Sequence, residues 1–261
     1  MDIVCVHSKD EIEAFARRNP FLHLYEIGDL DDFFWPHTTW YALQADGRIR
    51  QLVLLYTDLS MPIVLANAAE PVGSMHDLLV ALLPWLPKRF YGHLSPEVVA
   101  AFTDVYRVQA HGIHLKMGLQ NTSRLAKFEP SAAVKLASMD VEDVQTLFRA
   151  SYPVNWFVPR MLETGFYYGL RDGSKLVSVA GVHVYSERYR VAALGNITTH
   201  PDFRGRGLGT KLVAQLCLEL TRAGVERIGL NVKADNAAAI ACYEKVGFEQ
   251  VARYGEYTLQ L

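Results

Sequence analysis

The feature that most constrains this chain is a glycine-rich segment, Arg-Gly-Arg-Gly-Leu-Gly at 204–209. The residues before it, 191–199, are small, apolar and partly β-branched, which is typical of a buried strand. After it, apolar residues recur at helical spacing as far as Leu220, and this pattern predicts an amphipathic helix. A glycine loop between strand and helix leaves backbone N–H groups free at the positive end of the helix, where they bind phosphate groups. The sequence therefore predicts a site for a nucleotide-type cofactor.

The glycine spacing excludes two common phosphate-binding loops. A dinucleotide-binding fold needs Gly-x-Gly-x-x-Gly after its first strand, followed about 20 residues later by an acidic residue. Here the glycines are Gly205, Gly207 and Gly209, late in the chain and with no βαβ series before them. A P-loop ends in Gly-Lys-Ser/Thr, whereas here Thr210 precedes Lys211.

Two motifs in the second half of the chain identify a family resemblance. Arg204, Gly207 and Gly209 fit the pattern Arg/Gln-x-x-Gly-x-Gly/Ala. Further on, Asn236 begins a segment that ends Tyr-Glu-Lys-Val-Gly-Phe at 243–248, which fits Asn-x-x-Ala-x-x-x-Tyr-x-x-x-Gly-Phe. Found in this order, the motifs resemble the signatures of the GNAT superfamily of acyl-CoA-dependent N-acyltransferases.

The resemblance implies an α/β (α+β) fold with a mixed, mostly antiparallel GNAT sheet flanked by helices. We expect a catalytic, acyl-CoA-binding GNAT domain at 131–261, preceded by a polar linker at 119–130. The patterns within it predict a helix at 140–150, a hairpin at 166–185, a strand at 191–199, a helix at 207–223, a strand at 227–232, a helix at 236–245 and a final hairpin through Phe248 and Tyr257.

The first half of the chain repeats this order more faintly. It predicts a helix at 10–18, a hairpin at 40–56 around Asp46-Gly47, a strand at 63–66, a helix at 75–85, a strand at 90–93, a helix at 96–106 and a strand at 113–119. The loop at 66–74, which corresponds to the glycine loop, has a single late glycine, and its Glu70 would repel a phosphate. We therefore expect residues 1–120 to form a degenerate GNAT-like domain that binds no cofactor and helps to wall the substrate cleft. An unrelated small α/β lid is the alternative.

The resemblance assigns acetyl-CoA as co-substrate, with no metal. It implies that backbone N–H groups of the loop hold the phosphates, with added charge from Arg204 and Arg206, and that the preceding strand pairs with pantetheine. Gly195 and Asn196 interrupt that strand as a bulge would. We expect Asn236 to cap its helix and to reach the cofactor, with the cap alone as the alternative. The expected cofactor-binding residues are Ile197, Thr198, Thr199, Arg204, Gly205, Arg206, Gly207, Leu208, Gly209, Thr210 and Asn236.

The same resemblance places Tyr243 as the proton donor to the departing thiolate. The general base is left open, because residues 191–199 contain no carboxylate where many relatives have a glutamate. The candidates are His183, His200, Glu187, Glu256 and a water chain.

The composition of the chain argues against some classes of binding partner and of cellular location. The net charge is −2 with both signs interspersed, which argues against a dedicated nucleic-acid or anionic-membrane binder. The longest apolar stretch, 78–86, is far shorter than the roughly 20 residues that span a bilayer. The N-terminus has no signal-peptide pattern. Cys5, Cys217 and Cys242 are far apart and form neither zinc spacing nor a disulfide framework, so we expect reduced thiols in a cytoplasmic protein.

We expect acetyl transfer from acetyl-CoA to a primary amine by direct attack in a ternary complex. The tandem layout resembles the glycine N-acyltransferase-like branch, which favours a small molecule or an amino acid as acceptor. A protein N-terminal or lysine acetyltransferase is the alternative within enzymes. A non-catalytic acyl-CoA sensor is the alternative from another class, and the missing strand carboxylate favours it. The oligomeric state stays open.

Overall fold

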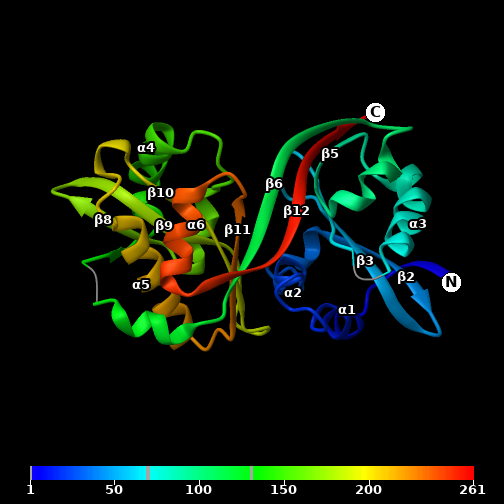
Figure 1. The fold of residues 1–261 in the computed structure, drawn as a ribbon, viewed down its shortest axis with the longest axis horizontal. Coiled ribbons are helices and arrows are strands. Elements are labelled where there is room, and N and C mark those ends of the chain that lie inside the picture. The colour runs from blue at the N-terminus through cyan, green and yellow to red at the C-terminus, as the bar shows by residue number, and fades with distance from the viewer. Residues whose placement is uncertain (1, 69–70, 130–131) are drawn as a thin grey trace. The chain divides into compact units, whose positions relative to one another are not determined.

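The computed structural model describes residues 2–68, 71–129 and 132–261. The chain forms two compact units: unit 1 is Met1–Lys116 with Val251–Leu261, and unit 2 is Met117–Gln250. The boundaries fall inside two strands, β6 (Arg107–Leu119) and β12 (Phe248–Gln260), which lie side by side (Figure 1). The predicted division at 120 and 131 left the last strand in the second domain, whereas the structure gives most of it to unit 1.

Unit 1 contains a mixed sheet with the strand order β1-β2-β3-β4-β5-β12-β6. Strands β4 and β5 pair in parallel, and the pairs β1–β2, β2–β3, β3–β4 and β5–β12 are antiparallel. Its further elements are β1 (Asp2–Cys5), α1 (Lys9–Ala16), α2 (Leu24–Gly28), β2 (Thr38–Ala45), β3 (Arg48–Tyr56), β4 (Ile63–Ala66), α3 (Val72–Leu82) and β5 (Arg89–Leu94).

Local sequence accounts for the core of unit 1. Asp46 and Gly47 have φ angles of 53° and 67°, so they form the left-handed two-residue turn that joins antiparallel strands. The inward face of α3, which includes Met75, Leu78 and Leu79, is buried in one cluster with β3, β4 and β5.

Unit 2 has the strand order β11-β10-β9-β8-β7, with β10 and β11 parallel and the other neighbours antiparallel (Figure 1). Helices α4 and α5 both contact β9. The elements are β7 (Val134–Lys135), α4 (Val141–Ser151), β8 (Tyr168–Asp172), β9 (Lys175–Ser186), β10 (Val191–Thr199), α5 (Leu208–Arg222), β11 (Arg227–Lys233) and α6 (Ala237–Val246). A mixed, mostly antiparallel sheet flanked by helices is the predicted fold class, which is thereby confirmed.

Most predicted elements are present, and β4 and β10 have the predicted bounds. The predicted final hairpin is wrong, because β12 runs unbroken through Gly255. A Cβ on Gly255 would lie 2.3 Å from the Tyr257 hydroxyl, so this glycine makes room for a side chain on an extended strand rather than for a turn. The predicted helix at 96–106 is a shorter 3-10 segment, Pro96–Phe102. Glu70 and the end of the predicted linker, Pro130, lie outside the described residues.

The two units share a connection pattern. In unit 2 the antiparallel pair β9–β10 leads through α5 to β11, which lies parallel to β10. In unit 1 the antiparallel pair β3–β4 leads through α3 to β5, which lies parallel to β4. This agreement supports our hypothesis that unit 1 is a degenerate copy of unit 2.

Candidate active site

The glycine loop of unit 2 connects β10 to α5, as predicted. Gly205 and Gly207 have φ angles of +76° and +75°, a conformation that residues with a side chain rarely adopt. Gly207 is the N-cap of α5, and no side chain of the described residues caps this helix. The first hydrogen bond of the helix runs from Lys211 N to Gly207 O (3.1 Å). The N–H groups of residues 208–210 therefore have no carbonyl partner within the helix. The loop therefore presents a cluster of donors suited to a phosphate.

The two arginines of the loop contact backbone carbonyls of unit 2. Arg204 donates from Nε to Thr199 O (3.1 Å) and from Nη2 to Ser151 O (3.2 Å), which ties the end of β10 to the end of α4. Arg206 donates to Asp202 O (3.0 Å), and its guanidinium carbon lies 4.9 Å from the centre of the Phe203 ring. Both side chains brace the loop; their predicted phosphate contacts stay a prediction.

Strand β10 has an open backbone edge next to the loop. Its parallel pairing with β11 covers Val191–Arg227 through Leu194–Leu230 and ends there, although β10 continues to Thr199. On its other edge, β10 pairs with β9 past a register shift between Gly195 and Thr198. The predicted bulge is therefore present, and residues 197–199 are half-buried with one edge that β11 does not pair in the described part of the chain, which suits the amides of a pantetheine chain.

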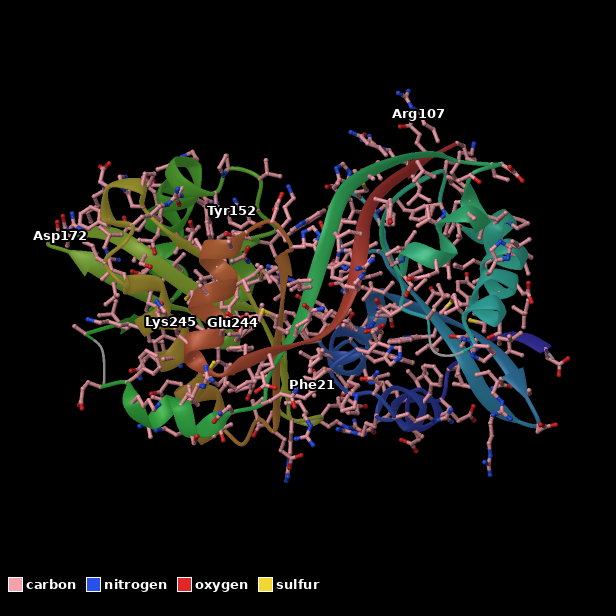
Figure 2. All side chains as sticks on the ribbon, in the orientation of Figure 1. Phe21, Arg107, Tyr152, Asp172, Glu244 and Lys245 are labelled. Atoms are coloured by element: carbon pink, nitrogen blue, oxygen red, sulfur yellow. The ribbon has the colours of Figure 1, made fainter. Side chains whose placement is uncertain are left out.

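Tyr243 lies on α6 and is buried, with its ring edge-on to Phe248 at 6.0 Å. Burial first, then the neighbouring Cys242 and Tyr152, raises the pKa of its phenol, so the hydroxyl keeps its proton at neutral pH. Figure 2 labels Tyr152 and the two exposed residues that follow Tyr243 on α6, Glu244 and Lys245. A protonated phenol is what the predicted donor role requires.

Asn236 and Cys242 have structural contacts at α6. The Asn236 side chain accepts a hydrogen bond from Ala239 N (3.2 Å), which is the predicted helix cap. Thr210 donates from its hydroxyl to Cys242 Sγ (3.2 Å), which joins α5 to α6. Burial raises the pKa of the Cys242 thiol, so Cys242 is poorly suited to act as a nucleophile.

The candidate bases lie in different surroundings. His183 lies against the bulge, because a Cβ on Gly195 would approach its ring to 2.3 Å. His200 accepts from Asp202 N (3.4 Å) and lies 3.1 Å from Lys175 Nζ, and Glu187 is exposed in the turn after β9. Glu256 belongs to unit 1. Of the four, His183 alone is shown in contact with the bulge.

The contacts that hold the bulge in place were not predicted from the sequence. Thr198 donates from its hydroxyl to Ser151 Oγ (3.1 Å), and the Asn196 side chain bonds to Tyr167. Neither Ser151 nor Tyr167 belongs to a motif, since each makes its hydrogen bond through tertiary packing that the linear pattern does not encode.

Among the described residues no cluster of three or more His, Cys, Asp or Glu side chains is arranged to hold a metal ion.

One family model matches a part of unit 2. Residues 139–248 match the model of the Acetyltransferase (GNAT) family. A [Ribosomal protein bS18]-alanine N-acetyltransferase from Salmonella typhimurium is 51% identical over 59 residues, which are 23% of this chain and 40% of that enzyme. The chain thus spans well under two thirds of that relative.

Solved structures share the fold over nearly the whole chain. A Drosophila protein aligns with a TM-score of 0.69 at 13% identity and covers 99% of this chain and 98% of its own. A tandem GNAT protein from the clavulanic acid biosynthesis pathway aligns with a TM-score of 0.54 at 16% identity, covering 98% and 97%. None of the helices in the described residues has the length and apolar character needed to cross a membrane.

Proposed function

From the premise that residues 139–248 are a GNAT acetyltransferase domain, we propose that this protein transfers an acetyl group from acetyl-CoA to a primary amine. The amine nitrogen attacks the thioester carbonyl directly, the C–N bond forms and the C–S bond breaks. The departing thiolate takes a proton from Tyr243, and the amine loses one to a base. Both substrates are bound together, so no acetyl-enzyme forms.

One observation carries this proposal: a short 3-10 turn, Pro201–Phe203, and the glycine loop join the open edge of β10 to the start of α5, which no side chain of the described residues caps. An acyl-CoA needs extended amide pairing for pantetheine and, beside it, backbone donors for the pyrophosphate. Both features occur in one stretch of unit 2, from 197 to 210. We place acetyl-CoA there, with the phosphates on the N–H groups of the loop and the pantetheine along residues 197–199.

We propose a small molecule or an amino acid as acceptor. The named activity of the Salmonella relative favours a second candidate, the N-terminal alanine of a protein. An assay with acetyl-CoA against free amino acids, small amines and alanine-ended peptides, read by mass spectrometry, separates the two. Acetylation of free amines supports the first candidate, and acetylation of peptides alone supports the second. Tight binding of acetyl-CoA with no transfer to any amine would identify a sensor instead.

We also place the protein in the cytoplasm, where cysteines are kept as reduced thiols. Cys5, Cys217 and Cys242 are all free thiols in the structure, which is consistent with that expectation.

The Tyr243→Phe variant tests the donor. We expect kcat to fall about tenfold with the affinity for acetyl-CoA unchanged. This factor is smaller than the rate enhancement of about 10²–10⁴ that a general acid usually contributes, because a thiolate leaves without full protonation. Steady-state kinetics with a working amine measure it, and Tyr168→Phe on β8 is the control. An unchanged kcat would remove Tyr243 from the mechanism.

A further inference from the structure

The bulge in β10 contains a residue in an unusual backbone conformation. Asn196 has a φ of 53°, which places it in the left-handed region, and it lies within the register shift between Gly195 and Thr198. Asparagine tolerates this region better than other residues with side chains, yet such a conformation persists only where the surroundings impose it. Asn196 is also 3% exposed, so its side chain lies in the interior of unit 2.

A chain of hydrogen bonds fixes the Asn196 side chain. Tyr167 donates its hydroxyl proton to Val182 O (3.0 Å) on β9. A phenol has one proton to give, so Tyr167 can only accept from Asn196, whose Nδ2 lies 2.9 Å away. The direction of these two hydrogen bonds places the Asn196 amide with its Nδ2 toward the Tyr167 hydroxyl. Asn196 Oδ1 has no hydrogen-bond partner among the described residues, so the amide is held by its nitrogen alone.

Tyr167 is itself rigid. It is completely buried, and a Cβ on Gly181 would approach its ring to 2.2 Å, so the ring rests directly on the backbone of β9. Its ring also lies 5.8 Å from that of Phe157. Burial raises the pKa of Tyr167, so its hydroxyl keeps the proton that it donates to Val182 O. The Tyr167 hydroxyl therefore has a fixed position, and its hydrogen bond with Asn196 holds the bulge in place.

We infer that Asn196 and Tyr167 are positioning residues that hold the β10 bulge in the shape that receives the acetyl thioester. The bulge lies between the paired part of β10 and the open edge at 197–199, which is the place where the thioester end of a pantetheine on that edge would lie. The role of the thioester in acetyl transfer rests on the proposed function. The effect of the two side chains on thioester binding does not rest on the proposed function, because a binding experiment measures it without any acetyl transfer.

The test compares acetyl-CoA with CoA, which lacks the acetyl group. Calorimetry on the whole protein measures both affinities for the wild type and for the variants Asn196→Gly, Asn196→Ala and Tyr167→Phe. We expect each variant to bind acetyl-CoA about tenfold more weakly and CoA as the wild type does, because the loop and the open edge are unchanged. With a working amine, kcat falls by at least the same factor.

Two controls exclude a merely structural role. Glycine adopts a positive φ freely, so if backbone strain were the only feature, Asn196→Gly would behave as the wild type or better. Arg190, the turn residue before β10, has a φ of 54°, and Arg190→Gly relieves the same strain away from the bulge. We expect Arg190→Gly to bind both ligands normally.

The coupling between the two side chains gives the decisive outcome. Because they act as one unit, the double variant Asn196→Gly/Tyr167→Phe should lose no more affinity for acetyl-CoA than either single variant. Additive losses, equal weakening of CoA and acetyl-CoA, or wild-type behaviour of Asn196→Gly would each overturn the inference. A wild type that binds acetyl-CoA but acetylates no amine would remove the proposed function and leave this comparison intact.

Discussion

A Gly207→Val substitution should weaken acetyl-CoA binding about 100-fold. Gly207 has a φ of +75°, and a β-branched residue in that conformation costs about 1–3 kcal/mol. The backbone would relieve this cost by rotating, and rotation would turn the N–H groups at the start of α5 away from the phosphates. A loss of about 3 kcal/mol corresponds to the expected factor of 100. Isothermal titration of acetyl-CoA into both proteins measures it.

The matched control for this substitution is Gly173→Val. Gly173 lies in the turn between β8 and β9, with a φ of +58°, and as at Gly207 a Cβ there would meet nothing within 4 Å. Both variants carry similar backbone strain, so both should lose thermal stability. Only Gly207→Val should lose acetyl-CoA affinity, and equal affinities in the two variants would contradict the loop assignment.

The second large effect concerns the stability of unit 1 in acid. His93 lies close to Glu256, with its Nε2 3.6 Å from Oε1, and its side chain is 14% exposed. Burial, opposed by Glu256, lowers the pKa of His93 to about 4 from its usual 6.5. The folded state therefore holds this imidazole neutral, whereas the unfolded chain takes up a proton once the pH falls below 6.5. Stability from this group is full above pH 6.5 and is lost down to about pH 4.

A carboxylate extends the loss to lower pH. Glu26 is 2% exposed, and its Oε1 accepts from Asn67 Nδ2 (2.9 Å) and lies 3.1 Å from His23 Nδ1. Burial alone would raise the pKa of Glu26, but His23, Lys116 and Asn67 outweigh it and lower the pKa to about 2 from 4.5. A lowered carboxyl pKa stabilises the fold above pH 4.5, and this contribution is lost as the pH falls toward 2.

Denaturant unfolding at about pH 7 and about pH 4 tests the His93 part. The wild type should lose about 3 kcal/mol of unfolding free energy from His93 between these conditions. His93→Gln removes the titrating group, so its loss should be smaller by that amount. A variant with the same response to pH as the wild type would show that His93 is not the source.

Sequence patterns predicted the parts of the fold that short-range rules control. Small and β-branched residues gave β10 its bounds, and the Asp46-Gly47 pair gave the β2–β3 turn. Strand β12 was harder, because Gly255 in a sequence resembles a turn residue until the neighbouring Tyr257 side chain is placed over it. The short helix α2 (Leu24–Gly28) was not predicted, since five residues are too few to show helical periodicity.

In the candidate site too, features set by residue type could be predicted and features set by tertiary packing could not. The glycine loop and the bulge at Gly195 follow from residue type, so the sequence indicated them, and the positive φ angles of Gly205 and Gly207 fit residues without a side chain. The contact of Arg204 with the Ser151 carbonyl and the bond between Asn196 and Tyr167 join residues 53 and 29 positions apart. Contacts at such separations depend on how strands and helices pack, and a single sequence does not encode them in a readable pattern.

Hydrogen exchange with and without acetyl-CoA tests the central assignment most directly, because it needs no knowledge of the amine. Acetyl-CoA should slow exchange at the amides of 197–199 and 205–210 in unit 2. It should leave the amides at the start of α3 unchanged, because α3 has the place in unit 1 that α5 has in unit 2 and our hypothesis makes unit 1 a degenerate copy that binds no cofactor. Protection at the start of α3, or none at 205–210, would contradict the account.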